Sequence, residues 1–81
     1  MTTQYRSIYA KIDIHGLSET EAKVYLDQML QSMPKEIVEV TVSHGYRSGN
    51  VLQNFIRKKY QNKKIVRKII SVNPGETIFQ L

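Results

Sequence analysis

At 81 residues, the chain is long enough for one small domain and too short for a second hydrophobic core. It has no cysteine, which excludes disulfide cross-links and thiolate metal sites and favours a reducing, cytoplasmic location. The net charge is +5, and neither a secretory signal nor an apolar stretch of bilayer-spanning length is present, so we expect a soluble protein without membrane contact.

The N-terminal part of the chain predicts a short lead-in and then a strand. Residues 1–7 are polar and are expected to be flexible, followed by a single domain over residues 8–81. From Ile8 to His15 apolar and polar residues alternate, which is typical of a half-buried strand, and Gly16 ends the pattern.

The next segment predicts an amphipathic helix. Ser18 and Glu21 have the spacing of a capping box, in which each side chain accepts a hydrogen bond from a free backbone amide of the other residue. Pro34 is expected to end the helix. The apolar residues recur at helical spacing and predict a buried face made of Ala22, Tyr25, Leu26, Met29, Leu30 and Met33.

The second half of the chain has a similar order of elements. A second strand is predicted at residues 36–44, with Val38, Val40 and Val42 facing the core. A second amphipathic helix begins near residues 48–50 and has as its apolar residues Val51, Leu52, Phe55, Ile56 and Tyr60. The remaining predicted elements are a third strand at 65–72, a proline-containing turn at 73–75 and a hairpin strand at 76–81.

These elements give the order βαβαββ and predict the fold class. Right-handed crossovers make the first three strands parallel and place both helices on one face of the sheet, while the last strand pairs antiparallel. The sequence therefore predicts a two-layer α/β sandwich with a four-stranded mixed sheet, whose other face is partly bare.

The charge of the chain is unevenly distributed. Residues 1–39 have a net charge of −2, whereas residues 40–75 contain no acidic residue. Such a one-sided field favours a polyanionic partner, and nucleic acid is the commonest one, although basic surfaces can also serve only solubility. The bases of the second half are Arg47, Arg57, Lys58, Lys59, Lys63, Lys64, Arg67 and Lys68.

Two His–Gly pairs mark the candidate site. His15 and His44 each end a predicted parallel strand, and the C-terminal ends of parallel strands meet at the edge where open α/β sheets bind ligands. Asp13 lies on the same face as His15. The loop 45–49 leads into a helix N-terminus, where free amides and the helix dipole favour an anion. We therefore expect a phosphate-binding site at this edge, formed by Asp13, His15, His44, Gly45, Arg47, Ser48 and Gly49.

Each of these residues also has a purely structural interpretation. Either histidine can be a satisfied structural residue, and His44 continues the apolar parity of the second strand, which favours its burial. The loop lacks the Gly-Lys-Ser/Thr ending of a Walker A motif, and a glycine after a strand is often only a turn former.

The residues IDIHG (12–16) and SHGYRSGNVLQNFIR (43–57) resemble the two motifs of the Smr (small MutS-related) domain, Leu-Asp-Leu-His-Gly and His-Gly-x-Gly-x-Gly followed by a helix. GETIFQL (75–81) is similar to the closing strand of that family. The resemblance covers residues 11–81. It implies a fold like the C-terminal domain of translation initiation factor three. It also implies nucleic-acid binding, with nicking or endonuclease activity on DNA or RNA in several members.

One position departs from the family pattern, because Arg47 stands where the family has its middle glycine. That change either strengthens phosphate capture or blocks the catalytic approach.

We therefore predict a nucleic-acid-binding domain that is a candidate endonuclease. His15, oriented by Asp13, is predicted to act as acid or base, while His44 and Arg47 with the amides of 45–49 hold the phosphate. Tyr46 is available to stack on an unpaired base. The bases from Arg57 to Lys68 are predicted to track the nucleic-acid backbone. Asp13 could bind a divalent metal, but one carboxylate and two histidines are few ligands for such an ion.

Two alternatives remain at this point. The first is a non-catalytic module that positions DNA or RNA for a partner protein. The second is a protein-interaction domain that uses the bare sheet face as its docking surface. Any targeting to a particular nucleic-acid structure would have to come from a protein partner.

Overall fold

Segments of alternating polarity form the sheet at the centre of the molecule. The structure, a computed structural model, describes residues 2–6, 8–46 and 50–81. The strands in this part of the chain are β1 (Thr2–Arg6), β2 (Tyr9–Asp13), β3 (Glu39–Ser43), β4 (Arg67–Ile70) and β5 (Glu76–Gln80). The helices are α1 (Glu19–Gln31) and α2 (Val51–Asn54), and α2 continues into one π-helical turn, η1 (Phe55–Lys59).

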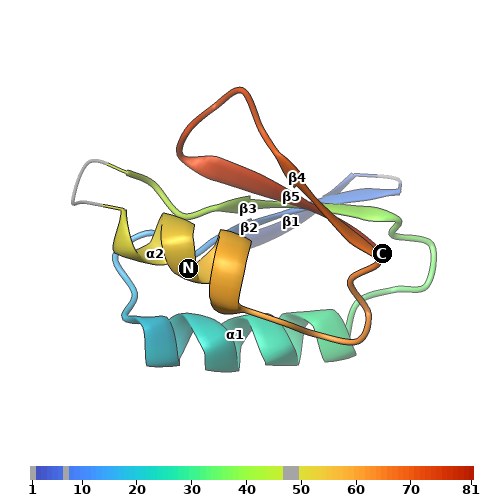
Figure 1. Ribbon diagram of the computed structural model, residues 1–81. Helices are drawn as coiled ribbons and strands as arrows, with labels where there is room; N and C mark the ends of the chain where they lie inside the picture. The colour runs from blue at the N-terminus through green and yellow to red at the C-terminus, as the bar shows by residue number, and fades with distance from the viewer. Residues whose placement is uncertain (1, 7, 47–49) are drawn as a thin grey trace.

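The described strands form one mixed sheet in the order β1-β2-β3-β5-β4, so β1 and β4 are its edges. β2 and β3 are parallel, whereas β5 is antiparallel to both β3 and β4. β4 therefore runs in the same direction as β2 and β3, although β5 lies between β3 and β4. Both helices lie on one face of this sheet (Figure 1). The predicted two-layer α/β fold with two helices on one face is confirmed, and the four predicted strands β2, β3, β4 and β5 form its mixed sheet together with β1.

The N-terminal segment extends that sheet by one strand. Residues 1–7 were expected to be a flexible lead-in, but Thr2–Arg6 forms β1 and pairs antiparallel with β2, from Thr2 opposite Asp13 to Arg6 opposite Tyr9. The expectation was wrong for residues 2–6 because their polar composition carries no alternating pattern. The neighbouring strand supplies the hydrogen-bond partners that define such an edge strand.

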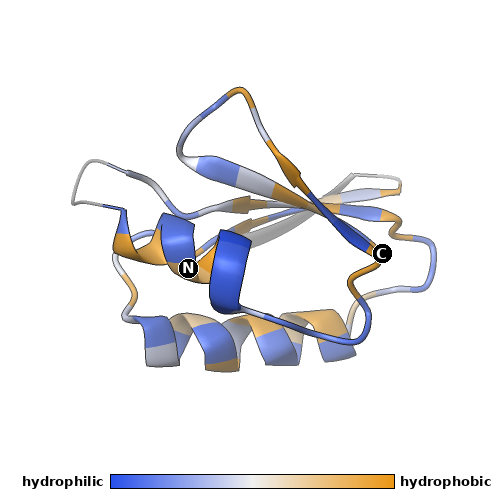
Figure 2. Ribbon diagram, in the orientation of Figure 1, coloured by the Kyte–Doolittle hydropathy of each residue, from blue (hydrophilic) through white to orange (hydrophobic). Residues whose placement is uncertain are grey.

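The hydrophobic core lies between the sheet and α1. Ala10, Ile12, Val40 and Val42 are buried on the helix-facing side of β2 and β3, as predicted. The apolar side of α1 faces these strands (Figure 2), with Leu26 fully buried. Ile8 and Val38 were also predicted to face the core, and for these two residues the prediction was wrong. Each lies just before the start of its strand, and they are 43% and 46% exposed.

The predicted capping box fixes where α1 begins. The Ser18 hydroxyl accepts a hydrogen bond from the Glu21 amide at 3.1 Å, and the Glu21 carboxylate accepts one from the Ser18 amide at 2.9 Å. Two backbone donors of the first helical turn are thereby satisfied. The loop that contains His15 is consequently anchored to the start of a stable helix.

The second helix is short and ends in a wide turn. The amide of Tyr60 donates to the carbonyl of Phe55, five residues earlier, at 2.7 Å. The Tyr60 ring is buried and stacks on Phe79, with ring centroids 6.0 Å apart, and its hydroxyl donates to the Asp27 carboxylate of α1 at 2.7 Å. This hydroxyl therefore ties the second helix to the first. Val51, predicted to belong to the apolar face, is 60% exposed.

Replacing Tyr60 by phenylalanine is expected to lower the free energy of unfolding by about 1.5–3 kcal/mol, because the ring remains but a hydrogen bond to a carboxylate is lost. Urea unfolding measures this change. Tyr9→Phe is the matched control: that ring is 51% exposed, so a change within about 0.5 kcal/mol is expected. Equal effects of the two substitutions would contradict the role assigned to the Tyr60 hydroxyl.

Candidate active site

The parallel pairing of β2 and β3 brings the two His–Gly pairs together. The amide of Ile14 donates to the Ser43 carbonyl at 2.9 Å, so the two strands end side by side, and a histidine follows on each. A Cβ atom added to Gly45 would lie 3.6 Å from the Cβ of His15. The structure therefore places both pairs at the edge of the sheet that the sequence indicates.

The glycine of each pair has a backbone conformation that other residues rarely adopt. Gly16 has φ +83° and Gly45 has φ +72°. A side chain in this left-handed region costs about 1–2 kcal/mol, so glycine is the residue that lets each strand turn sharply after its histidine. The two glycines therefore set the direction in which the chain leaves the sheet at this edge.

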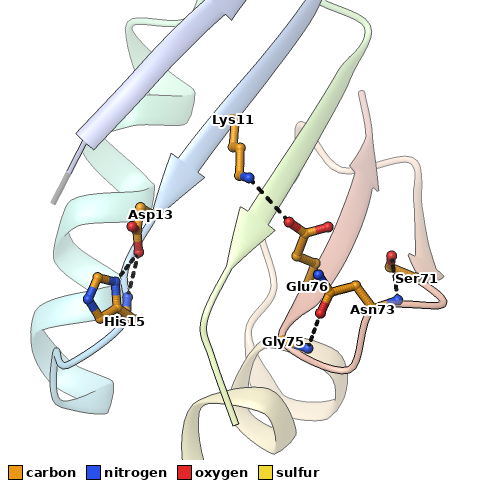
Figure 3. Close-up of polar contacts among 7 residues, drawn as sticks. All are labelled: Lys11, Asp13, His15, Ser71, Asn73, Gly75 and Glu76. Carbon is orange, nitrogen blue, oxygen red and sulfur yellow. Dashed lines mark hydrogen bonds and ion pairs between the residues drawn. The ribbon is translucent and has the colours of Figure 1, made fainter. Parts of the chain in front are cut away.

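Asp13 holds the exposed ring of His15. The Asp13 carboxylate lies 2.5 Å from Nδ1 of His15 and also accepts a hydrogen bond from the His15 amide at 3.1 Å (Figure 3). The His15 side chain is 69% exposed and that of Asp13 is 31% exposed. An ionised carboxylate only accepts hydrogen bonds, so Nδ1 carries the proton and Nε2 of the neutral ring has a free lone pair. That lone pair is available to take a proton from a substrate.

The environment of Asp13 favours its ionised form. Partial burial raises the pKa of this carboxyl group, but the two hydrogen bonds from His15 and the attraction of its ring outweigh the burial and lower the pKa below its usual value. Asp13 is therefore a carboxylate at neutral pH and fixes the tautomer of His15 as well as its orientation.

His44 has a different environment, because its ring is buried and both ring nitrogens are occupied. Nδ1 lies 2.9 Å from the Gly45 carbonyl oxygen, which only accepts, so Nδ1 carries the proton. Nε2 must then accept from the Thr77 hydroxyl at 2.9 Å. The same hydroxyl accepts a hydrogen bond from Nε of Arg57 at 2.8 Å, and Arg57 also donates to the Glu76 carbonyl at 2.9 Å. His44 thus belongs to a buried chain of hydrogen bonds from Gly45 to Arg57.

Acidification is expected to destabilise the fold through His44. Burial lowers the pKa of His44 below its ordinary value of 6.5, and the nearby Arg57 charge acts in the same direction. The unfolded chain therefore binds a proton at a pH where the folded chain does not, so this stability is complete above pH 6.5 and is lost as the pH falls below that value. Urea unfolding between about pH 5 and pH 7.5 should show a steeper loss in the wild type than in His44→Gln. Equal slopes would contradict the assignment.

The loop after His44 differs from the phosphate site that the sequence predicts. The amides of His44 and Gly45 both donate to the Gly75 carbonyl, at 2.8 and 3.0 Å. The Gly45 amide is therefore not free for a phosphate, which corrects the prediction for this group. The ring of Tyr46 is 51% exposed beside this loop, as stacking on a base requires. Arg47, Ser48 and Gly49 lie outside the described residues.

The turn between β4 and β5 forms the third wall of the site. The side-chain oxygen of Asn73 accepts a hydrogen bond from the Gly75 backbone amide at 2.8 Å. The backbone amide of Asn73 donates to the Ser71 hydroxyl at 3.1 Å (Figure 3). Gly75 approaches the Cα of Gly45 closely enough that an added Cβ would lie 3.4 Å away. Together, the turn and the two His–Gly loops enclose a hollow of about 640 Å³, which His15, His44, Tyr46 and Gly75 help to line.

The described wall of this hollow carries negative charge as well as the two histidines. Glu19 and Glu76 are among its lining residues, and the Glu76 carboxylate pairs with Lys11 at 3.3 Å. Within the described ranges, no group of three or more histidine and carboxylate side chains could hold a metal ion. The positive charge expected at the phosphate site falls on Arg47, outside those ranges.

Three of the bases predicted to track nucleic acid have structural partners. Besides Arg57, Lys64 donates to the carbonyls of Leu30 and Gln31 at the end of α1, at 2.6 and 3.2 Å. Lys68 donates to the Tyr60 carbonyl and lies 5.9 Å from the centroid of the Phe79 ring, where burial lowers its pKa. Among the described bases that were predicted to track nucleic acid, those whose side chains have no hydrogen-bond or ion-pair partner are Lys58, Lys59, Lys63 and Arg67.

Thr77 is the site residue that sequence reasoning missed. It is fully buried and connects His44 with Arg57. The available signal was its position in β5, where it shares the inward parity of Phe79 although its side chain is polar. Asn73 was expected only as part of a turn.

The fold and the paired His–Gly turns define a small two-layer α/β domain with its candidate site at the C-terminal ends of two parallel strands. Residues 12–77 match the family model for the Smr domain, and the chain belongs to this family. Its fold is similar to the crystal structure of the Smr domain of Thermus thermophilus MutS2, with a TM-score of 0.68 and 19% sequence identity over 86% of this chain and 94% of that chain. A search of curated proteins found no match. No helix in the described ranges is long and apolar enough to cross a membrane.

Proposed function

We propose that this Smr domain binds nucleic acid and cleaves a phosphodiester bond, with His15 as the general base. The observation that carries the proposal is the exposed His15 ring beside the hollow, whose Nδ1 is held by Asp13 while Nε2 has no hydrogen-bond partner among the described residues. A base with a fixed tautomer and an open lone pair is what activation of a hydroxyl nucleophile requires. Membership of the Smr family supports the same substrate class.

In this mechanism, a water or a neighbouring 2′-hydroxyl attacks the phosphorus atom and gives its proton to Nε2 of His15. The bond from phosphorus to the leaving oxygen breaks, and that oxygen takes a proton from His15 or from solvent. Asp13 stabilises the imidazolium that forms in between, because the carboxylate faces Nδ1. Arg47 remains our candidate for the charge that neutralises the phosphate.

His44 has a positioning role in this proposal. Its two ring nitrogens bond to Gly45 and Thr77, so the ring holds the second His–Gly turn against the first and does not face the substrate. The catalytic contact predicted for His44 would require at least one of these hydrogen bonds to break.

The second candidate function is a non-catalytic module that positions nucleic acid for a partner protein. Glu19, which lines the hollow and has no cationic partner among the described residues, favours this alternative, because a carboxylate repels a phosphate. Both candidates predict binding to a polyanion, and only the first predicts cleavage.

A panel of labelled single-stranded, duplex and branched DNA and RNA, incubated with and without divalent metal, tests the proposal. We expect binding and cleavage of at least one form. For duplex DNA with about six phosphate contacts, log K should fall against log salt with a slope near −5. Binding without cleavage of any form would support the positioning module. A flat salt dependence would instead favour a protein partner.

A further inference from the structure

A second hollow with a different electrostatic character lies between η1 and β4. Its volume is about 690 Å³, and Ile65 and Val66 form part of its wall. The described side chains that line it include no aspartate or glutamate. They do include five bases, namely Arg57, Lys58, Lys63, Arg67 and Lys68.

Three of these bases are available to a ligand. Arg57 and Lys68 are held by Thr77 and Tyr60, as described above. Lys58, Lys63 and Arg67 have no polar partner among the described residues. Cations gathered without a counter-charge repel one another, and a bound polyanion removes this repulsion. The second hollow therefore has the chemistry of a phosphate-binding site, which the first hollow lacks in its described wall.

The register of the sheet separates the two hollows. Glu76, at the start of β5, pairs with Ser43 near the candidate active site, whereas Gln80, at the other end of β5, pairs with Arg67. Four residues of a strand span roughly 14 Å, and β2 and β4 are three strand spacings, also about 14 Å, apart across the sheet, so Arg67 lies roughly 20 Å from the end of β2 that His15 follows. A single phosphate therefore cannot contact both His15 and Arg67. At about 3.4 Å per stacked nucleotide, the interval corresponds to about six nucleotides of one strand.

We propose that this basic hollow is a second phosphate subsite, which binds the substrate strand about six nucleotides from the bond that is cut. The inference rests on the proposed function and adds to it a requirement for substrate length. Oligonucleotides too short to reach from His15 to Lys58, Lys63 and Arg67 bind weakly, whereas longer ones gain these contacts.

A pair of double variants with equal loss of charge tests the subsite. Lys58→Gln/Lys63→Gln removes two bases from the hollow, and Lys23→Gln/Lys35→Gln removes two exposed bases that do not line it and do not belong to the bases predicted to track nucleic acid. The probes are fluorescein-labelled single-stranded DNA and RNA oligonucleotides of about three and about twelve nucleotides. Fluorescence anisotropy over a salt series measures Kd without depending on cleavage.

For the hollow variant, we expect the Kd of the long probe to rise about tenfold, while the Kd of the short probe changes little. The slope of log K against log salt should become shallower by about 1.4, for two lost contacts to a single strand. If the wild type cuts the long probe, KM should rise with kcat unchanged. The control variant should leave the difference between short and long probes intact.

Two results would overturn the inference in distinguishable ways. Equal effects of the two variants on the long probe, or equal losses for short and long probes, would remove the subsite and leave the proposed function standing. Failure of the wild type to bind any probe at low salt would overturn the subsite and the proposed function together.

Discussion

Replacing His15 by alanine is expected to reduce phosphodiester cleavage by about 10²- to 10⁴-fold, the range that a general base contributes. The loss should appear in kcat, because Nε2 of His15 acts on the nucleophile during the chemical step. Nucleic-acid binding should be nearly unchanged, since the bases that we propose to contact phosphate lie elsewhere. The measurement is single-turnover cleavage of whichever substrate the wild type cuts, together with Kd from fluorescence anisotropy.

Two further measurements make this result specific. The His15 side chain is 69% exposed, so His15→Ala should change the free energy of unfolding by no more than about 0.5 kcal/mol. Asp13→Asn keeps the shape of the partner but removes its charge, and an intermediate loss of rate is expected. A His15→Ala protein that cuts as fast as the wild type would eliminate the proposed mechanism.

Thr77→Val is expected to lower the free energy of unfolding by about 3 kcal/mol. Valine has nearly the same shape, but it leaves Nε2 of His44 without a donor and Nε of Arg57 without an acceptor. Buried polar groups that lose their partners are costly, and two are affected here. Urea unfolding measures the change, and the same variant should cleave more slowly because the Gly45 turn is held through His44.

Thr41→Val is the matched control for this substitution. Thr41 lies on β3, the strand next to β5, but on the open face of the sheet. The same chemical change there should alter the free energy of unfolding by no more than about 0.5 kcal/mol. If both valine substitutions have small effects, the hydrogen-bond chain through Thr77 does not stabilise the fold.

The parts of the fold that could be predicted are those specified by local pattern. The alternation after Ile8 and the Ser18–Glu21 capping box depend on residues close in sequence, and both the strand and the helix start are found as expected. β1 has no such pattern, because its strand conformation comes from pairing with β2. The π-helical turn also escaped prediction, since it depends on how Tyr60 fits against Phe79 and Asp27.

The candidate site was predictable in position but not in its hydrogen bonding. Parallel strands place His15 and His44 at one edge, and the sequence is sufficient to infer this. The burial of His44 depends on Thr77, which is 33 residues away, and the partners of Lys64 on α1 are as distant. The sequence gives the number of basic residues, whereas only tertiary contacts distinguish those that cap a helix from those that remain free.

The exposed edge of the sheet at β4 has a consequence for solubility. Val66, just before this short strand, and Ile70, its last residue, are 78% and 69% exposed, and such an edge can recruit the edge of a second molecule. Arg67 and Lys68 lie between them, so two copies meeting strand to strand would bring like charges together. Concentrated salt screens this repulsion and should make the protein more prone to self-association, whereas dilute buffer keeps the molecules apart.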